Sequence, residues 1–253
     1  MAVICYEKCY VCGESSNFNI EDGAVLLREA NCSHCYASIR YSDTARVISG
    51  IYIQESLSLS EGVDRLHGLS ILESQSDGPI HEVLQVLPRY TCFEYLDGVK
   101  PGEYKDDVLC NDFENLTFED SQFDLVISQD VFEHVSLPEK AFREIHRVLK
   151  PGGYHVFTVP LHEGRNSKSR NGLPKVYHGD PLREEGAFVF TDWGDDILTI
   201  VDAFGMSTTR YDLHILHSIE EITNVDETYS DYLQLPHINY FKYNSVVFAS
   251  MKK

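Results

Sequence analysis

The sequence predicts an α/β fold: a Rossmann-like, mostly parallel sheet with helices on both faces, preceded by a small cysteine-containing module. Residues 123–160 read as buried strand, polar loop, amphipathic helix and second buried strand, which is the pattern of a βαβ unit. Two tight cysteine pairs stand near the N-terminus. With 253 residues, 43% of them hydrophobic, the chain can form one large domain and a small one.

The cysteine pairs are two C-x-x-C motifs, Cys9 with Cys12 and Cys32 with Cys35. Their separation is typical of a structural zinc site with four thiolate ligands. Such a module has too small a core to fold alone, and metal ligation can supply on the order of 10 kcal/mol. Cys5 or His34 could replace one ligand, and two unrelated reduced pairs are the alternative interpretation.

The zinc-ribbon-like module is expected over residues 1–45, a linker with a leading helix over 46–66, and the Rossmann-like domain over 67–253. In that domain, short apolar runs predict strands at 69–72, 90–94, 107–110 and 123–128, with a helix at 79–87 after the first. Cys92 and Cys110 fall within these strands and read as small buried hydrophobes.

The helix after the fourth predicted strand has clear boundaries. Ser136 can cap it with Glu139 three residues later, and Pro138 suits its first turn. One apolar face follows, and residues 150–153, Lys-Pro-Gly-Gly, end the helix before a strand at 154–159.

The C-terminal third begins with a long polar segment near 161–190, and connections of this kind are often functional lids. Asp192 can cap a helix at 193–204, and two final strands are expected at 206–214 and 245–250. A tyrosine-rich insert at 219–243 would cover the sheet edge or the mouth of a pocket.

The charge balance excludes some partners. Forty acidic and 21 basic residues give a formal charge of −19, which disfavours nucleic acids and anionic membranes. No run is long enough for a membrane span, and the N-terminus lacks an apolar signal core. We therefore expect a cytoplasmic protein with a small-molecule substrate; its oligomeric state is left open.

The amino-acid sequence of residues 123–160 resembles that of a known protein family. D-x-x-E-H-V, an amphipathic helix, R-V-L-K-P-G-G and an apolar strand resemble class I S-adenosylmethionine-dependent methyltransferases of the small-molecule or sugar type. The likeness runs from about Leu69 to the C-terminus. It implies a seven-stranded sheet with S-adenosylmethionine lying across the carboxyl ends of the first strands.

The same resemblance implies the cofactor contacts. An acid after the first strand would contact the methionine end, one after the second would accept the ribose hydroxyls, and an acid with an aromatic residue after the third would hold the adenine. The matching residues are Glu73, Glu94 with Tyr95, Asp112 with Phe113, and Gln129 and Asp130 after the fourth strand.

The glycine-rich loop of that family is the point of departure. Gln75 and Asp77 stand where glycines are usual, and only Gly78 remains. The loop can bind S-adenosylmethionine along a different backbone path, it can bind an altered cofactor, or the domain has lost catalysis. Ser, Asp and Gly all form turns, which favours the first interpretation.

The catalytic candidates are histidines, because transfer to a hydroxyl or an amine requires removal of a proton. His134 follows the fourth strand, and a purely structural role at the helix start is its alternative. His178, with Asp180 as an orienting partner, is an equal candidate, and His162 is another.

The resemblance implies S-adenosylmethionine-dependent methyl transfer to a hydroxyl or amine of a small molecule, such as a saccharide or secondary metabolite. The alternative is an inactive methyltransferase-like module that binds a protein partner. A dehydrogenase is disfavoured because the sequence has no G-x-G-x-x-G motif.

Overall fold

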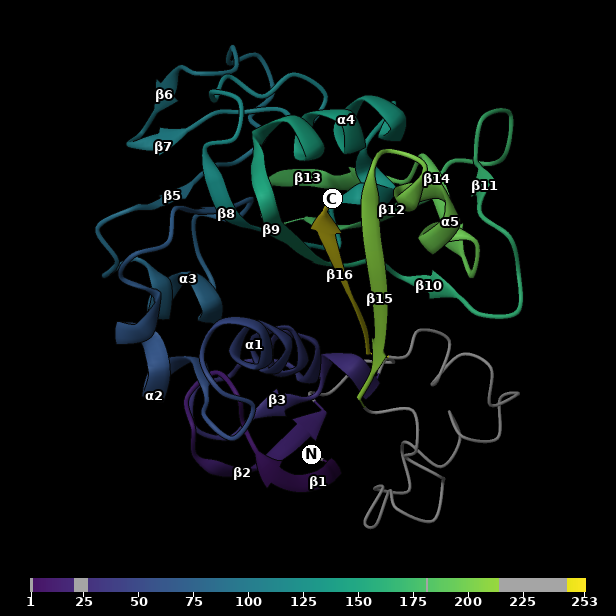
Figure 1. Cartoon of the computed structure of the whole chain (residues 1–253). Coiled ribbons are helices and arrows are strands. Elements are labelled where there is room, and N and C mark those ends of the chain that lie inside the picture. Colours follow the sequence, from purple (N-terminus) through teal and green to yellow (C-terminus); the bar gives the residue numbers. More distant parts are fainter. Residues whose placement is uncertain (1, 21–26, 181, 214–244) are drawn as a thin grey trace. The chain divides into compact units, whose positions relative to one another are not determined.

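The computed structural model describes residues 2–20, 27–180, 182–213 and 245–253 (Figure 1). The chain forms two compact units, which are described separately below. The first unit contains residues 1–69, 77–90 and 210–247, and the second contains 70–76, 91–209 and 248–253. Within the described residues, no helix has the length and apolar character needed to cross a membrane.

The first unit combines a three-stranded antiparallel sheet, ordered β1-β2-β3, with short helices. Ser38 caps the long helix α1, where its side chain accepts a bond from the Tyr41 N–H, as expected at an N-cap. α1 runs across position 45, where we placed the end of the small module; that boundary stays a prediction. The elements are β1 Ala2–Lys8, β2 Ser15–Ile20, η1 Leu27–Glu29, β3 Asn31–Cys32, α1 Ile39–Tyr52, α2 Leu59–Gly62, η2 Val63–Leu66 and α3 Pro79–Leu84.

The second unit holds the main sheet. Its first half contains β4 Ile71–Glu73, β5 Tyr90–Cys92 (whose first residue belongs to the other unit), β6 Tyr104–Lys105, β7 Val108–Leu109, β8 Phe123–Gln129, η3 Phe132–His134, α4 Pro138–Val148 and β9 Leu149–Thr158. Its second half contains β10 Leu161–His162, β11 Lys168–Ser169, β12 Tyr177–Asp180, β13 Arg183–Phe188, β14 Thr191–Gly194, α5 Ile197–Asp202, and the strands β15 Met206–Asp212 and β16 Val246–Lys252, which both units share.

The main sheet has the order β15-β16-β9-β8-β4-β5. β4, β8 and β9 are parallel neighbours, and β16 joins β9 in the antiparallel sense. The predicted Rossmann-like architecture is confirmed. Among the described residues, however, the main sheet has six strands and not the expected seven. The missing strand is β7, which pairs with β6 in a hairpin and reaches the sheet through a single parallel bridge between Glu94 and Cys110.

The βαβ unit at 123–160 forms as predicted, with two corrections at its helix. Residues 150–153 do not separate the helix from the next strand, because β9 begins at Leu149, directly after α4, and includes Lys-Pro-Gly-Gly. Every residue of β8 except Asp124 is buried, as in a central parallel strand. Ser136 does not cap α4, whose N-cap residue Leu137 has no side-chain cap. Instead, the Glu114 carboxylate accepts bonds from the Ser136 hydroxyl at 2.6 Å and from the Leu137 N–H at 2.9 Å. A residue distant in sequence therefore replaces the predicted capping box.

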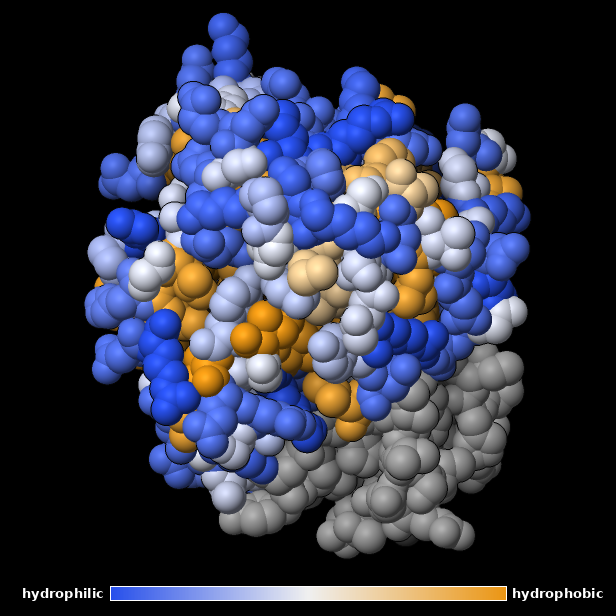
Figure 2. Space-filling view, in the orientation of Figure 1, coloured by the Kyte–Doolittle hydropathy of each residue, from blue (hydrophilic) through white to orange (hydrophobic). Residues whose placement is uncertain are grey.

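The core of the second unit is a cluster of aromatic rings. Phe132 is fully buried, and its ring stacks on Phe142 with centroids 4.6 Å apart. His155 stacks on Phe157 at 4.5 Å, and Phe157 stacks on Phe248 at 5.1 Å. Outside such cores, hydrophilic side chains cover most of the face shown in Figure 2, in keeping with the acidic composition.

The C-terminal third differs in detail from the sequence-based prediction. The helix expected at 193–204 is only α5, because the Asp192 region forms β14 and the Asp192 side chain pairs with Arg170. The polar segment near 161–190 contains short strands and the antiparallel hairpin β12–β13. The tyrosine-rich insert at 219–243 lies outside the described residues.

Candidate functional site

The four predicted zinc ligands lie together in the first unit. The Sγ atoms of Cys9, Cys12, Cys32 and Cys35 are all within 4.8 Å of one another, and those of Cys9 and Cys35 are 3.7 Å apart. In a tetrahedral zinc site with Zn–S bonds of about 2.3 Å, neighbouring sulfurs lie roughly 3.8 Å apart. The four thiols therefore fit zinc, and they would complete its coordination without leaving a position for a substrate.

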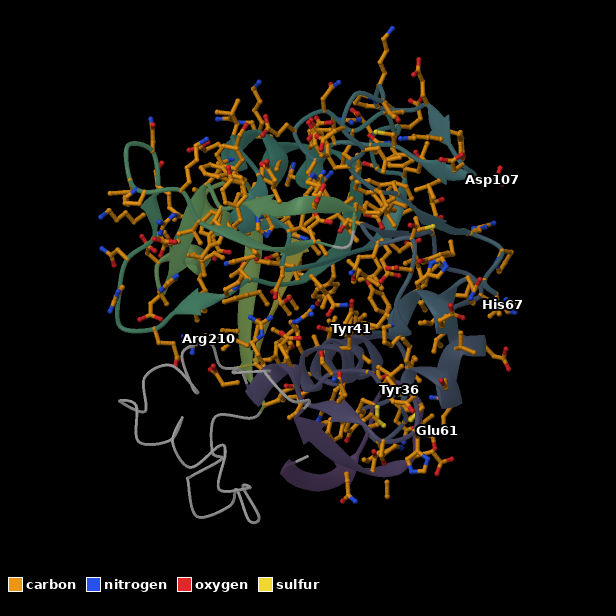
Figure 3. All side chains as sticks on the ribbon, turned by 180° about the vertical axis from the view of Figure 1, so that it is seen from behind. Tyr36, Tyr41, Glu61, His67, Asp107 and Arg210 are labelled. Carbon is orange, nitrogen blue, oxygen red and sulfur yellow. The ribbon has the colours of Figure 1, made fainter. Side chains whose placement is uncertain are left out.

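Each cysteine pair sits in a turn closed by a residue with left-handed backbone. Gly13 has φ +89° and donates its N–H to the Cys9 carbonyl, and Tyr36 has φ +60° and donates to the Cys32 carbonyl. A side chain at Gly13 would place Cβ 2.8 Å from the Ser58 Oγ, so glycine is needed there. Tyr36, which is labelled in Figure 3, is 73% exposed, so its side chain has room. His34 is exposed, and its backbone N–H donates to the Cys32 Sγ.

In the second unit, polar residues follow the carboxyl ends of neighbouring strands, as predicted. Glu73 ends β4 and Gln129 ends β8, and both side chains are at least 95% buried. Ligands of open α/β sheets bind at this edge. A buried acid and a buried amide can meet a polar ligand there without competition from water.

Glu94 follows β5, and its carboxylate is held in place by a loop residue that sequence reasoning missed. Both the N–H and the hydroxyl of Ser76 donate to Glu94 Oε1, at 2.7 Å and 3.0 Å. Ser76 belongs to the degenerate loop after β4. The loop therefore orients the acid that is expected to accept the ribose hydroxyls.

The loop itself needs only one glycine conformation. Among the described residues, Gly78 has φ +95°, whereas Gln75 and Asp77 have ordinary negative φ values. Gly78 is the N-cap of α3 in the first unit, where an added Cβ would lie 3.3 Å from the Tyr41 hydroxyl. The two substitutions for glycine thus cause no backbone strain.

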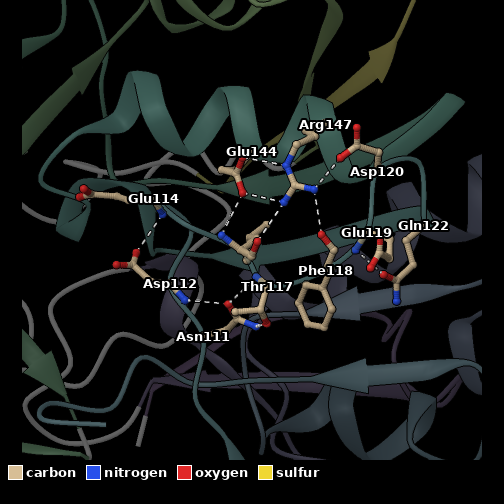
Figure 4. Close-up of polar contacts among 11 residues, drawn as sticks. Asn111, Asp112, Glu114, Thr117, Phe118, Glu119, Asp120, Gln122, Glu144 and Arg147 are labelled. Atoms are coloured by element: carbon tan, nitrogen blue, oxygen red, sulfur yellow. Dashed lines mark hydrogen bonds and ion pairs between the residues drawn. The ribbon is translucent and has the colours of Figure 1, made fainter. Parts of the chain in front are cut away.

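Asp112 lies after β7 in a segment that one arginine holds. Its carboxylate accepts a bond from the Glu114 N–H at 2.8 Å, and burial raises its pKa. The Arg147 guanidinium bonds the Leu116 and Phe118 carbonyls and the Glu144 carboxylate, all within 2.9 Å (Figure 4). This arginine is the R of the R-V-L-K-P-G-G segment, so that signature fixes the loop that carries Asp112.

Phe113 and Tyr95 occupy different surroundings. Phe113 is 4% exposed and its ring packs edge-on against Phe93, so it belongs to the aromatic core. Tyr95 is exposed, and the Arg183 guanidinium lies over its ring at 5.6 Å. Their contacts with an adenosine group stay predictions.

Asp130 adopts a left-handed conformation immediately after β8, with φ +52°. Thr158 holds it there: the Thr158 hydroxyl donates to the Asp130 carboxylate at 2.9 Å, and the Asp130 N–H donates to the Thr158 carbonyl at 3.1 Å. A non-glycine residue held in this region is typical of functional sites.

The structure brings two of the predicted catalytic histidines together around an acid that sequence reasoning missed. Glu133 Oε1 lies 3.6 Å from His134 Nε2 and 3.6 Å from His178 Nδ1. The two imidazole rings are nearly perpendicular, with centroids 5.1 Å apart. Glu133 is 1% exposed, and burial, together with the nearby charge of Asp130, raises its pKa, while His178 opposes that shift.

Asp180 and His162 lie elsewhere. The Asp180 carboxylate pairs with the Arg183 guanidinium and accepts a bond from the Leu182 N–H. The carboxylate beside His178 is thus Glu133. His162 Nε2 lies 3.8 Å from Asp192 Oδ1, which also belongs to the ion pair with Arg170.

Comparison with known proteins gives a family for part of this site. Residues 92–157 match the family described as methyltransferase domain. The glycine/sarcosine/dimethylglycine N-methyltransferase of Actinopolyspora halophila is 37% identical over 89 residues, which are 34% of this chain and 15% of that protein. The sarcosine/dimethylglycine N-methyltransferase of Halorhodospira halochloris is 47% identical over 49 residues, 19% of this chain and 18% of that protein.

Among solved structures, an S-adenosylmethionine-dependent methyltransferase from Mesorhizobium loti is similar with a TM-score of 0.44 and 12% identity, over 74% of this chain and 91% of that one. The chain spans less than a fifth of the length of the two curated relatives. The matched segment confirms the recognition of a methyltransferase domain, and it contains Glu94, Asp112, Asp130 and Glu133.

Proposed function

Because residues 92–157 carry a methyltransferase domain, we propose that the protein transfers a methyl group from S-adenosylmethionine to a nitrogen or oxygen atom of a small molecule. The observation that carries the proposal is the Glu94 carboxylate, which follows β5 and is fixed by two bonds from Ser76. A carboxylate has about four acceptor sites, so Glu94 can accept hydrogen bonds from a diol such as a ribose in addition to the two bonds from Ser76.

The remaining cofactor contacts are assigned along the same sheet edge. Glu73 and Gln129 would hold the charged amino-acid end, because both are buried polar groups at strand ends. Asp112 would accept from the adenine amino group, and Arg147 keeps its segment in place. Bound there, the cofactor supplies an electrophilic methyl group, and the protein's contribution is mainly positioning, worth roughly 7–11 kcal/mol of barrier.

The acceptor is proposed to meet the Glu133, His134 and His178 cluster, where its proton can be taken. An amine acceptor is supported by the curated relatives, whose names describe N-methylation of glycine derivatives. A hydroxyl or amine on a saccharide or secondary metabolite remains within this proposal. The four cysteines are proposed to bind a structural zinc ion, because their sulfurs fit a closed tetrahedral site.

Calorimetric titration of the full chain with S-adenosylmethionine and S-adenosylhomocysteine tests the cofactor assignment. Glu94→Gln keeps the shape of the side chain but removes its charge, and we expect it to weaken binding about tenfold, or about 1.4 kcal/mol. The matched control is Glu103→Gln, because Glu103 is exposed in the same unit. Folded wild-type protein that binds neither ligand would contradict the proposal and favour the inactive, protein-binding alternative.

The acceptor is tested with methyl-labelled cofactor and a panel that contains sarcosine, dimethylglycine and amino sugars. Label transferred to an amine, with a product mass increase of one methylene group, would support small-molecule N-methylation. Label transferred to a hydroxyl group would retain methyl transfer but reassign the acceptor atom. If the protein binds the cofactor but transfers no label to any member of the panel, the proposed class of acceptor is wrong.

A further inference from the structure

The Glu133, His134 and His178 cluster has the composition of a metal site, separate from the four cysteines. Its three side chains come from two segments, η3 and β12, that are far apart in the sequence. One ligand atom from each lies within 4.8 Å of the others, and Glu133 Oε1 is 3.6 Å from a nitrogen of each histidine. With metal–ligand bonds of about 2.0–2.2 Å, neighbouring ligand atoms of a tetrahedral site lie roughly 3.3–3.6 Å apart.

The hydrogen bonding of His134 leaves its other nitrogen available as a ligand. His134 Nδ1 lies 2.9 Å from the Phe188 carbonyl oxygen. A carbonyl can only accept, so Nδ1 carries the hydrogen, and in a neutral ring Nε2 then has a lone pair that faces Glu133. Metal-bound histidines are typically oriented by such a bond from the second ring nitrogen to a carbonyl.

Glu133 is the strongest reason to expect a cation. Its side chain is 2% exposed, and neither carboxylate oxygen has a hydrogen-bond partner among the described residues. At 3.6 Å, Glu133 Oε1 is too far from either imidazole nitrogen for a direct hydrogen bond. The ionised form of a carboxyl group buried in this way is costly, so the group either keeps its proton or lies close to a positive charge. An ion between the three ligand atoms would provide that charge.

The hairpin that carries His178 is docked in a way that preserves this geometry. The Phe190 N–H donates to the Glu133 carbonyl at 2.7 Å, next to the bond between His134 and Phe188. At Gly186, a Cβ would lie 2.2 Å from the His178 carbonyl oxygen. Only glycine therefore lets β13 approach β12 this closely. The second histidine is thereby held against η3 by backbone contacts that do not depend on the ion.

We propose that Glu133, His134 and His178 bind a divalent first-row transition metal ion such as Zn²⁺ or Mn²⁺. Two imidazoles and one carboxylate are a three-ligand set, which leaves at least one coordination position open, as in catalytic rather than structural sites. An acceptor hydroxyl or amine bound at that position would have a lowered pKa. This last role rests on the proposed methyl transfer, whereas metal binding itself does not.

The test uses the full chain with its cysteine site already loaded with zinc, titrated with Zn²⁺ and with Mn²⁺ by calorimetry. One further binding event per chain is expected for the wild type. Glu133→Gln and His178→Gln should each weaken it at least tenfold, while His67→Gln, at an exposed histidine of the other unit (Figure 3), should not. Near-UV circular dichroism and the melting temperature report whether each variant is folded.

The result that overturns the proposal is a folded, zinc-loaded wild type that takes up no second ion, or a second ion whose affinity is unchanged in both variants. If Glu133→Gln fails to fold, His178→Gln decides alone, because His178 is partly exposed on the hairpin. S-adenosylmethionine titrated into the same samples separates the two proposals, since cofactor binding without a second metal refutes only the metal site.

Discussion

The first unit contains a cluster of four cysteines, two of them completely buried, whereas the second unit is built around stacked aromatic rings. Both units bury large apolar side chains, among them Phe18 and Ile48 in the first. What distinguishes the first unit is its four clustered thiols, a ligand set through which zinc can stabilise the fold. The second unit instead buries titratable side chains such as Glu133 and His155. We therefore propose that zinc bound by the first unit would serve folding, and that the polar cluster in the second unit would serve chemistry.

The largest expected effect is the loss of the first unit's metal. Cys9→Ser should remove about one zinc per chain and unfold the N-terminal region, because ligation contributes on the order of 10 kcal/mol. Elemental analysis and amide hydrogen exchange would measure both. Cys92→Ala, outside the cluster, is the control and should keep its zinc. If the Cys9→Ser protein lacks zinc and its N-terminal amides are still protected from hydrogen exchange, the first unit does not need zinc to fold.

The next effect lies in the second unit, at Arg147. Its guanidinium makes five short bonds, among them those to the Leu116 and Phe118 carbonyls. Lysine cannot reproduce this fork, so Arg147→Lys should lower the free energy of unfolding by about 3 kcal/mol. Chemical denaturation measures it. Arg143→Lys on the same helix is the control, and equal losses in both variants would show that the clamp has no special role.

Acid should weaken the second unit through His155. Burial lowers its pKa to about 3, and its Nε2 bonds the Ser128 hydroxyl at 2.8 Å. Between pH 3 and the ordinary imidazole pKa of about 6.5, the unfolded chain binds the extra proton, so stability falls as the pH falls. From pH 7.5 to 5 the loss should be about 2 kcal/mol.

His155→Phe supplies the comparison, because a phenyl ring can stack on Phe157 in the same place. Denaturation curves at pH 7.5 and pH 5 for both proteins give the change in the free energy of unfolding with pH, which is then compared between them. Equal pH dependence in the two proteins would mean that His155 does not titrate in this way.

The smallest effect compares the two cysteine turns of the first unit. Tyr36→Gly should raise the free energy of unfolding by about 0.5 kcal/mol, since relief of left-handed strain exceeds the added entropy of glycine in the unfolded chain. Gly13→Ala should lower it by about 2 kcal/mol, because the new Cβ strains the backbone and crowds Ser58. Thermal unfolding with zinc in excess measures both, and the same sign for the two variants would contradict the assignment.

Features that depend on local spacing were predictable from the sequence. The cysteine pairs come together, the buried strand predicted at 123–128 is present as β8, and a helix follows it, although the predicted cap and stop of that helix do not form. Features that depend on contacts between distant segments were not. Glu114 replaces the predicted cap of α4 from 22 positions away, and β7 forms a hairpin because two residues are too short for a full strand of the sheet.

The candidate site shows the same division. His134 and His178 could be chosen for their chemistry, but nothing in the sequence pairs His178 with Glu133, since that contact requires the β12–β13 hairpin to dock on η3. The clue in the sequence was the E-H dipeptide after a buried strand, where only the histidine was chosen. Ser76 was missed for a similar reason, because its bond to Glu94 joins two loops.

The single left-handed glycine of the loop after β4 has a consequence for altering this protein. Since Gly78 alone needs glycine's backbone freedom, Gln75 and Asp77 each present a side chain where the resembled family presents bare backbone. Their polarity and size can be varied without a conformational penalty from the main chain. If the loop contacts the cofactor as proposed, selectivity between S-adenosylmethionine and modified sulfonium donors can be engineered at these two positions on either side of Ser76, which a loop of glycines does not offer.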